Sequence, residues 1–434
     1  MIPAQNFSGA ENFSAPLLDG RMTMNRRIPE ILAPAGDREC LAAALRYGAD
    51  AVYVGGKQFG MRASAANFDA QGLKEAADTA HQAGAKLYVT CNTLPHEGEL
   101  ERLPEFLQLV QAAGADALIV ADLGVMALAQ RYAPRCDLHV SVQLGAVNSA
   151  AVRRLGELGA ARVVLSRELS LGDIARIREK NPDGPELECF VHGSQCLSVS
   201  GRCLLSHVLT GRDANRGDCA QPCRWRYHLT EEKRPGRYFP VEETQDGSYI
   251  LDANDLCMIE HVAALAQAGV TSLKIEGRAK AAFYVAGTVN AYRMAVDGYA
   301  ASGCSPEYHP PEWVREETEK VSHRPYGTGF YFGIPGQNVR AGGYVRPYEV
   351  AAVSEEWRDG RLRVSQRNRF FRGDVLEILV PGKKPLSLPV SSLWSENGEE
   401  LETANHAQMT VWLPCAEPVA SGLFLRRRIA EVTP

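Results

Sequence analysis

The 434-residue sequence lacks the features of a membrane protein, a secreted protein or a uniformly basic protein. It has no uninterrupted apolar run of about 18 residues, the length that a membrane-spanning helix needs. Its first residues have neither the charged start nor the apolar stretch of a signal peptide. Lysine and arginine (47) do not outnumber aspartate and glutamate (52), which excludes a uniformly basic nucleic-acid binder but not local basic patches. We therefore expect a cytoplasmic protein without membrane association, whose residues 1–28 form a disordered leader.

Several hydrolase motifs are also missing. The sequence has no G-x-S-x-G turn, no H-E-x-x-H helix and no identifiable Cys–His pair outside one group of clustered cysteines. Its eleven cysteines are an odd number in a chain expected in a reducing compartment. This favours free thiols, metal ligation or catalysis over disulfides.

What the sequence does contain is a regular alternation of short apolar runs and amphipathic stretches, several of which end in glycine as helices do. Such alternation indicates a parallel sheet, and eight repeats fit a closed TIM-like (β/α)8 barrel better than the alternative, an open doubly wound sheet. The eight predicted strands are EILAPAG, DAVYVGG, KLYVTCNTL, DALIVAD, LHVSVQL, ARVVLSRE, ELECFVHG and SLKIEGR. Asp122, after the fourth run, is expected to cap the following helix.

The domain boundaries follow from this pattern. We assign the barrel to residues 29–303, with a cysteine-rich insertion at about 194–262 before the last strand; so long a connection is usually functional. The stretch DLCMIEHVAALAQAG at the end of the insertion is expected to be a helix. A proline-marked linker at 304–343 leads to residues 344–434, whose short alternating runs predict a small antiparallel β-barrel domain.

Four cysteines in the insertion follow the pattern C-x6-C-x15-C-x3-C: Cys196, Cys203, Cys219 and Cys223. Only the second pair has the spacing of a structural zinc knuckle, so zinc is the less favoured alternative. An iron–sulfur cluster tolerates irregular spacing and prefers backbone amides and cations around its sulfurs, which the glycines and arginines of this segment supply. The cysteines could also be buried small apolar residues, a role that suits the isolated cysteines better.

The segments FVHGSQCLSVSGRCLLS, GDCAQPCRW, LAPAG, GADAVYVGG, LSRELSL and SLKIEGR make the sequence resemble the peptidase U32 family, also called collagenase-like proteases. The resemblance extends from Glu30 to the C-terminus. Within the family, the sequence is most similar to the branch of tRNA hydroxylation proteins that form 5-hydroxyuridine at the wobble position. This resemblance implies that the four clustered cysteines bind a [4Fe-4S] cluster and that prephenate serves as a cofactor or oxygen source.

A small dicarboxylate such as prephenate requires cations at the carboxyl-terminal face of the barrel, where barrel active sites lie. The candidates at predicted strand ends for binding the cofactor are Arg62, Arg167, Arg278 and Gln143. The candidates for catalysis are His192, Arg167 and Glu276. His192 could hydrogen-bond a cluster sulfur, act as an acid or base, or cap its strand. Each arginine could instead be a salt-bridged surface residue, with Glu168 and Glu276 as structural partners.

A tRNA substrate would present an unstacked base in a single-stranded loop, so the protein needs a pocket, which could be the barrel mouth, and phosphate contacts. Two basic stretches with interleaved aromatic residues, CRWRY and RLRVSQRNRFFR, suit single-stranded RNA. The candidate RNA-binding residues in them are Arg224, Arg226, Arg367 and Arg369. Two other functions remain open: a U32-type peptidase, for which we find no catalytic apparatus, and a non-catalytic RNA-binding protein with structural zinc.

Overall fold

The computed structural model describes residues 28–61, 66–196, 198–225, 229–230, 238–239, 243–244, 247–248, 253–333, 335 and 344–429. Eight parallel strands close into a barrel, because the last strand pairs with both the first and the seventh. The closed barrel and the eight predicted strands are thereby confirmed. The strands are β1 (Glu30–Pro34), β2 (Ala51–Gly55), β3 (Lys86–Cys91), β4 (Ala117–Val120), β5 (Asp137–Val140), β6 (Arg162–Val164), β7 (Glu186–Gly193) and β13 (Ser272–Ile275).

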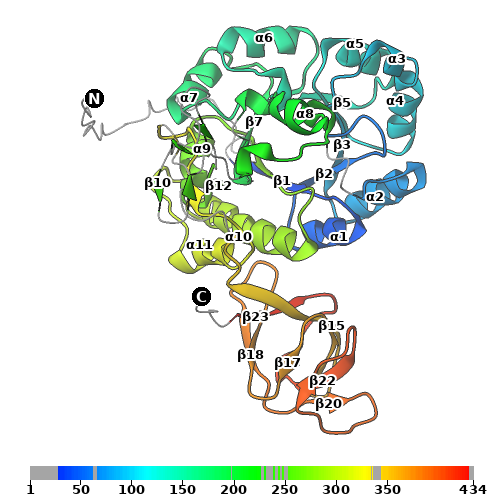
Figure 1. The fold of residues 1–434 in the computed structure, drawn as a ribbon, viewed down its shortest axis with the longest axis vertical. Coiled ribbons are helices and arrows are strands. Elements are labelled where there is room, and N and C mark those ends of the chain that lie inside the picture. Colours follow the sequence, from blue (N-terminus) through cyan, green and yellow to red (C-terminus); the bar gives the residue numbers. More distant parts are fainter. Residues whose placement is uncertain are drawn as a thin grey trace.

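Helices surround the barrel (Figure 1) and cover the outer faces of its strands. Many begin where a short polar side chain accepts a hydrogen bond from the first turn, as predicted for Asp122, which accepts from the Val125 amide. Among the described residues, none of the helices has the length and apolar character needed to cross a bilayer. The helices of the barrel layer are α1 (Arg38–Arg46), α2 (Ala70–Gln82), α3 (Glu97–Leu100), α4 (Leu103–Ala112), α5 (Leu123–Tyr132), α6 (Ser149–Glu157), α7 (Leu171–Glu179), α9 (Val262–Gln267), α10 (Ala282–Ala301) and α11 (Glu312–Glu319).

Charged side chains form a network inside the barrel. The buried Arg162 guanidinium pairs with Glu188 at 3.2 Å and with Glu30 at 2.6 Å, and the Lys274 ammonium pairs with Glu188 at 2.6 Å. Glu188 is fully buried, and its pairing with two cations compensates for the loss of its hydration. The network lies on the interior face of β6, β7 and β13, next to the apolar interior cluster that includes Tyr53 and Tyr88.

The chain between β7 and α11 differs in two places from the expected secondary structure. The start of the expected helix forms a strand, β12 (Asp255–Cys257), which pairs antiparallel with the end of β7; the helix itself begins only at Val262. Within the segment expected to be a linker, α11 packs against α10 and β14 (Tyr326–Gly327) pairs parallel with β12. Residues 304–327 therefore extend the barrel domain.

The C-terminal residues form the expected antiparallel β domain. Its seven-stranded sheet is a half-barrel, since the edge strands β19 and β20 are not paired with each other in the described part of the chain. The domain lies on the side of the barrel that carries α1 and α10 (Figure 1), where the Tyr47 hydroxyl donates to the Leu379 carbonyl at 2.9 Å. The strands of this sheet are β15 (Tyr348–Arg358), β16 (Arg361–Gln366), β18 (Val375–Ile378), β19 (Leu386–Pro389), β20 (Trp394–Ser395), β22 (Thr410–Pro414) and β23 (Phe424–Arg428).

Candidate functional site

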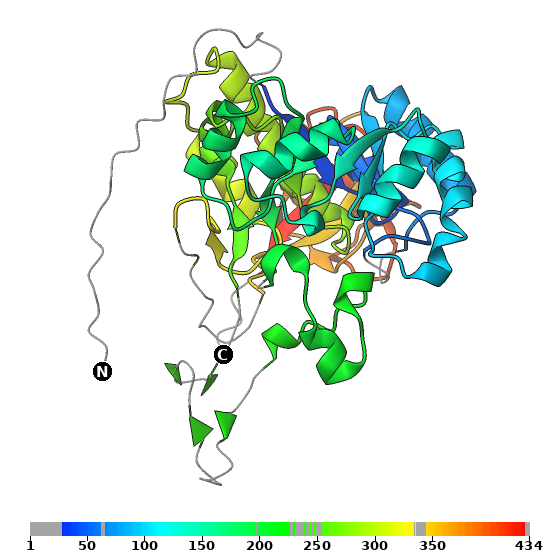
Figure 2. The same cartoon turned by 90° about the horizontal axis from the view of Figure 1, so that it is seen from above.

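The clustered cysteines lie in a compact lobe, residues 194–225 without 197, that follows β7 (Figure 2) and that we call the cysteine lobe. Figure 2 shows the lobe projecting from one side of the barrel. Short helical turns build it, and glycine or a polar residue in the left-handed conformation separates several of them. The turns are η3 (Val199–Gly201), α8 (Leu205–Thr210), η4 (Ala214–Arg216) and η5 (Pro222–Arg224).

Three contacts attach the cysteine lobe to the loops that follow β3, β5 and β6. The Arg202 Nε donates to the Gln143 carbonyl at 2.7 Å, and the Ser200 amide donates to the Glu168 carboxylate at 2.7 Å. Arg216 forms two hydrogen bonds with Glu99. All three contacts are at the carboxyl ends of barrel strands, so the lobe lies over the face where barrel enzymes place their active sites. Sequence reasoning missed Glu99 and the role of Glu168, because both pair with residues far away in the sequence.

The cysteines differ in exposure. Cys196 and Cys219 are exposed, Cys203, Cys223 and Cys257 are intermediate, and the other six are buried. Burial raises the pKa of the Cys91 and Cys189 thiols to about 12, so these side chains remain neutral. Only the lobe cysteines therefore combine access to solvent with a shared location.

Hydrogen bonds to sulfur favour the thiolate form in the lobe. The Leu205 amide donates to the Cys203 sulfur and the Gln221 amide to the Cys219 sulfur, both at 3.3 Å. Partial burial acts to raise the pKa of Cys203, but hydrogen bonds from Ser198 and from the backbone outweigh it and lower the pKa below its ordinary value. Backbone amides that donate to cysteine sulfurs are typical of iron–sulfur sites.

The donor set therefore fits an iron–sulfur cluster in its chemistry. In the described ranges, no three His, Cys, Asp or Glu side chains are yet grouped closely enough to hold a metal ion. The lobe also exposes Val199, Leu204 and Val208, so it has little apolar core of its own. Small segments with so little core commonly depend on a metal group for stability, and binding such a group would draw the four thiols together.

Arg278 extends across the barrel mouth after β13. Its Nη1 donates to the Thr90 hydroxyl at 2.7 Å, and its Nη2 donates to the Met61 carbonyl at 3.2 Å. Gly55 makes room for it, because a Cβ at that position would lie 2.5 Å from Nη1. These partners are neutral, and they hold a buried guanidinium in place at the mouth. Arg62, predicted to act beside it, lies outside the described residues.

The other candidates of the barrel mouth surround the start of the lobe. Arg167 lies over the Phe190 ring at 3.8 Å and donates to the Ser194 carbonyl at 2.8 Å, which holds the chain where it leaves β7. Gln143 is buried, and its side-chain oxygen has no hydrogen-bond partner among the described residues. The Glu276 amide donates to the His192 carbonyl at 2.8 Å, which places Glu276 at the end of β13.

His192 faces α10 and not the barrel interior. A register shift at the end of β7 pairs Phe190 with Lys274 but His192 with Ile275, so the side-chain alternation slips by one residue. The buried His192 ring packs against three tyrosines, and its Nε2 lies 3.3 Å from the Tyr326 hydroxyl. Burial lowers its pKa to about 3, so the ring is neutral at physiological pH. This position keeps the imidazole away from the lobe, and its catalytic role stays a prediction.

The two basic stretches differ in what surrounds their arginines. In the C-terminal domain, Arg363 pairs with Glu355 and Glu396, although the basic stretch itself contains no acid. Arg367 and Arg369 are exposed, and no carboxylate of the described residues lies within 4.0 Å of either. In the other stretch, Arg226 and the side chain of Arg224 lie outside what the structure describes.

Comparisons with known proteins cover nearly the whole chain. The model of Peptidase family U32 matches residues 36–341, and the model of the Peptidase family U32 C-terminal domain matches residues 346–426. The chain is 36% identical to tRNA hydroxylation protein P1 of Bacillus subtilis, over 90% of this chain and 92% of that protein. It is also 36% identical to tRNA hydroxylation protein P of Escherichia coli, over 93% and 98%. A third relative, the 23S rRNA 5-hydroxycytidine C2501 synthase of Escherichia coli, is 37% identical over 83% of this chain and 54% of its own length. The chain belongs to peptidase family U32.

Proposed function

We propose that this protein is an iron–sulfur RNA-modifying enzyme that hydroxylates wobble uridine in tRNA to 5-hydroxyuridine. The observation that carries the proposal is the position of the four accessible thiols, on a lobe attached over the carboxyl-terminal face of a closed barrel. Relatives named tRNA hydroxylation proteins align with this chain over nearly their full lengths, which supports tRNA as the substrate.

In this proposal Cys196, Cys203, Cys219 and Cys223 hold a [4Fe-4S] cluster, which would supply a Lewis-acid or electron-transfer site when bound. Arg202 and Arg216 hold the lobe against the barrel, so the cluster and the mouth keep a fixed separation. The arginine charges also favour the anionic thiolates of the site.

Hydroxylation at C5 of uracil replaces a C–H bond by a C–OH bond, which adds one oxygen atom and removes two electrons from the base. A co-substrate must supply the oxygen and accept the two electrons, as a donor does when it gives up the oxygen of a C–OH group and keeps a C–H bond in its place; we propose prephenate for this role. Arg278 provides a buried, pre-positioned cation at the mouth for one of the two carboxylates, and Arg167 and Gln143 lie at neighbouring strand ends. Mass spectrometry of the product, after reaction with labelled prephenate, water or dioxygen, identifies the oxygen donor.

The deciding experiment begins with iron and acid-labile sulfide analysis of protein purified without oxygen. We expect about four irons per chain and broad absorption near 400 nm, as for a cubane cluster held by four thiolates. Each of the four cysteines is then replaced by serine, with Cys304→Ser, a buried cysteine in the barrel layer, as the matched control. We expect each lobe variant to lose iron and tRNA hydroxylation, and the control to keep both. Full iron content and activity in Cys196→Ser would disprove the cluster assignment.

The same preparations separate the two other candidate functions. Stoichiometric zinc without visible absorption would favour a non-catalytic RNA-binding protein. Cleavage of gelatin by the wild-type protein, absent from a preparation of a lobe cysteine variant, would favour a peptidase. The peptidase function has no supporting catalytic group in the described residues, since thiols that ligate a metal are poor nucleophiles.

A further inference from the structure

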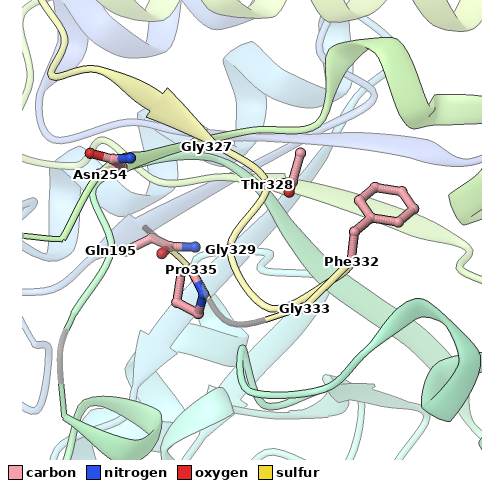
Figure 3. A pocket seen from close by; sticks show the side chains of 8 residues that line it. All are labelled: Gln195, Asn254, Gly327, Thr328, Gly329, Phe332, Gly333 and Pro335. Atoms are coloured by element: carbon pink, nitrogen blue, oxygen red, sulfur yellow. The ribbon is translucent and has the colours of Figure 1, made fainter. Parts of the chain in front are cut away.

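A pocket of about 190 Å³ lies where the chain leaves β7, beside the cysteine lobe (Figure 3). The end of β7, the start of β12 and the loop after β14 form its walls. In Figure 3 the side chains of Gln195 and Pro335 lie on one side of the hollow and those of Thr328 and Phe332 on the other. The described residues of the lining are Gln195, Asn254, Gly327, Thr328, Gly329, Phe332, Gly333 and Pro335.

The lining is polar but carries no charge. Two carboxamides, Gln195 and Asn254, and the hydroxyl of Thr328 provide hydrogen-bond donors and acceptors. In Figure 3 the Asn254 Oδ1 points away from the hollow, and this atom is shielded from solvent, so Asn254 offers the pocket its amide nitrogen, a hydrogen-bond donor. No lysine, arginine or histidine is among the described side chains of the lining, so the pocket suits a neutral ligand and not a dicarboxylate.

Glycines keep the pocket open and one aromatic ring stands at its edge. A Cβ at Gly329 would collide with the carboxamide nitrogen of Gln195. The backbone at position 329 can therefore lie this close to the Gln195 side chain only because the residue is glycine. The Phe332 ring contacts His261 at a centroid distance of 4.6 Å but is otherwise 55% exposed. An exposed aromatic ring beside a polar pocket is the arrangement on which proteins stack unpaired bases.

The size of the pocket limits the ligand. Pockets for drug-sized ligands measure about 300–1,000 Å³, so about 190 Å³ corresponds to a single small ring system. Uracil matches the lining because its edge alternates carbonyl acceptors with the N3–H donor, and a carboxamide offers the complementary donor and acceptor. Gln195 directly precedes Cys196 in the sequence, so the pocket adjoins the start of the cysteine lobe.

We propose that this pocket, and not the axial mouth of the barrel, receives the flipped-out pyrimidine of the RNA substrate. Phe332 stacks on the base, and Asn254 and Gln195 read its edge. The mouth then remains available to the anionic co-substrate near Arg278. The inference rests on the proposed function, because that function supplies the pyrimidine.

The test uses full-length protein purified without oxygen and an RNA hairpin with the anticodon loop, in which 2-aminopurine follows the wobble uridine. Flipping the uridine unstacks 2-aminopurine and raises its fluorescence. We expect Phe332→Ala and Asn254→Asp to lose this rise and to lower kcat/KM for hydroxylation about 5- to 100-fold, the range of one base–aromatic stacking contact. Hairpin affinity should change less than about threefold, because phosphate contacts dominate it, and iron content should equal that of the wild type.

Val375→Ala is the matched control, since Val375 is 54% exposed and lies in the C-terminal domain; it should behave as the wild type. A fluorescence rise that survives both pocket substitutions overturns the inference, whatever happens to the rate. If the wild type raises the fluorescence but makes no 5-hydroxyuridine, and the pocket variants lose the rise, the pocket assignment stands and the proposed function fails. Melting temperatures of both variants, expected to be close to that of the wild type, separate loss of binding from loss of folding.

Discussion

Arg216 of the cysteine lobe forms two hydrogen bonds with the Glu99 carboxylate, at 2.7 and 2.6 Å, and so connects the lobe to the helix that follows β3. This pair joins residues that are 117 positions apart in the sequence. Paired hydrogen bonds of this kind fix orientation as well as distance, because the planar guanidinium matches the carboxylate.

We predict that Arg216→Met loosens the lobe. Limited proteolysis should cleave within the lobe faster than in the wild type, and iron retention should fall. Arg212→Met is the control, because Arg212 pairs with Asp218 inside the lobe and does not contact the barrel. Equal cleavage rates in the two variants would contradict this role of Arg216.

The pH dependence of the same contact follows from Glu99. The hydrogen bonds from Arg216, with help from the His96 amide, lower the pKa of Glu99 to about 2. A lowered carboxyl pKa stabilises the folded form above the unfolded value of about 4.3, and this contribution is lost as the pH falls through about 2. Proteolysis of the lobe, followed with an acid-tolerant protease, should therefore stay slow down to about pH 4 and accelerate below it.

We predict two classes of cysteine in protein from which iron has been removed. Iodoacetamide should alkylate Cys196, Cys203, Cys219 and Cys223 in the native state. Cys203 should react faster than its partial exposure alone predicts, because hydrogen bonds lower the pKa of its thiol. Cys91 and Cys189 should react only after unfolding, since burial raises their pKa to about 12. Peptide mass spectrometry measures each site. Reconstitution with iron and sulfide should protect the first class alone, and rapid labelling of Cys91 would refute the assignment.

The charged network inside the barrel provides a matched pair of variants. Arg162 contacts both Glu188, which is fully buried, and Glu186, whose side chain is 53% exposed. Glu188→Gln should lower the free energy of unfolding by about 3–5 kcal/mol, because it removes the carboxylate that pairs with the buried Lys274 ammonium. Glu186→Gln should lower it by less than about 1 kcal/mol. Denaturant unfolding measures both changes, and equal effects would contradict the importance of burial.

This network also predicts that the free energy of unfolding depends on pH. Burial acts to raise the pKa of Glu188, but Lys274 and Arg162 outweigh it and lower the pKa below its ordinary value. The contribution of the carboxylate is therefore complete above the unfolded pKa of about 4.3 and decreases as the pH falls through the folded value. The difference in the free energy of unfolding between the wild type and Glu188→Gln should therefore shrink as the pH falls.

For the barrel mouth, we predict that Arg278→Met weakens prephenate binding at least tenfold, since a hydrogen bond to a charged group contributes about 1.5–3 kcal/mol. Iron content should not change, because the Thr90 hydroxyl and the Met61 carbonyl, to which Arg278 donates, belong to the barrel and not to the lobe. Isothermal titration calorimetry measures the affinity, with Arg293→Met, which breaks an ion pair with Asp50, as the control. Unchanged affinity in Arg278→Met would remove this residue from the co-substrate site.

For the C-terminal domain, we predict that Arg367→Ala and Arg369→Ala weaken tRNA binding and reduce its dependence on salt. Each lost phosphate contact should lower the slope of log affinity against log salt by about 0.7–0.9. Arg363→Ala should have a smaller effect, because Glu355 and Glu396 already neutralise its charge. Filter binding at several salt concentrations distinguishes the three, and an equal loss in Arg363→Ala would argue against a specific surface.

The sequence was sufficient to predict the barrel, since each strand is a short apolar run and many of the helices begin at a polar capping residue. It did not predict that His192 faces α10, because the register shift that turns the ring depends on pairing between β7 and β13. For the same reason Asp255–Cys257 was expected to be helical, although pairing with β7 makes it a strand. The pairs Glu99–Arg216 and Arg363–Glu396 were likewise beyond prediction, because the residues in each are distant in sequence. The pocket beside Gln195 combines three separate segments and had no local signal.

The attachment of the cysteine lobe bears on the order in which the molecule can mature. Its contacts at Glu99, Gln143 and Glu168 join loops after β3, β5 and β6, which lie in order within one continuous run of paired strands. β13, which follows the lobe in the sequence, closes the barrel by pairing with β1 and β7. Zinc fingers fold around their metal; here barrel strands build the surface that receives the lobe, so in the proposed function iron loading would follow the pairing of those strands.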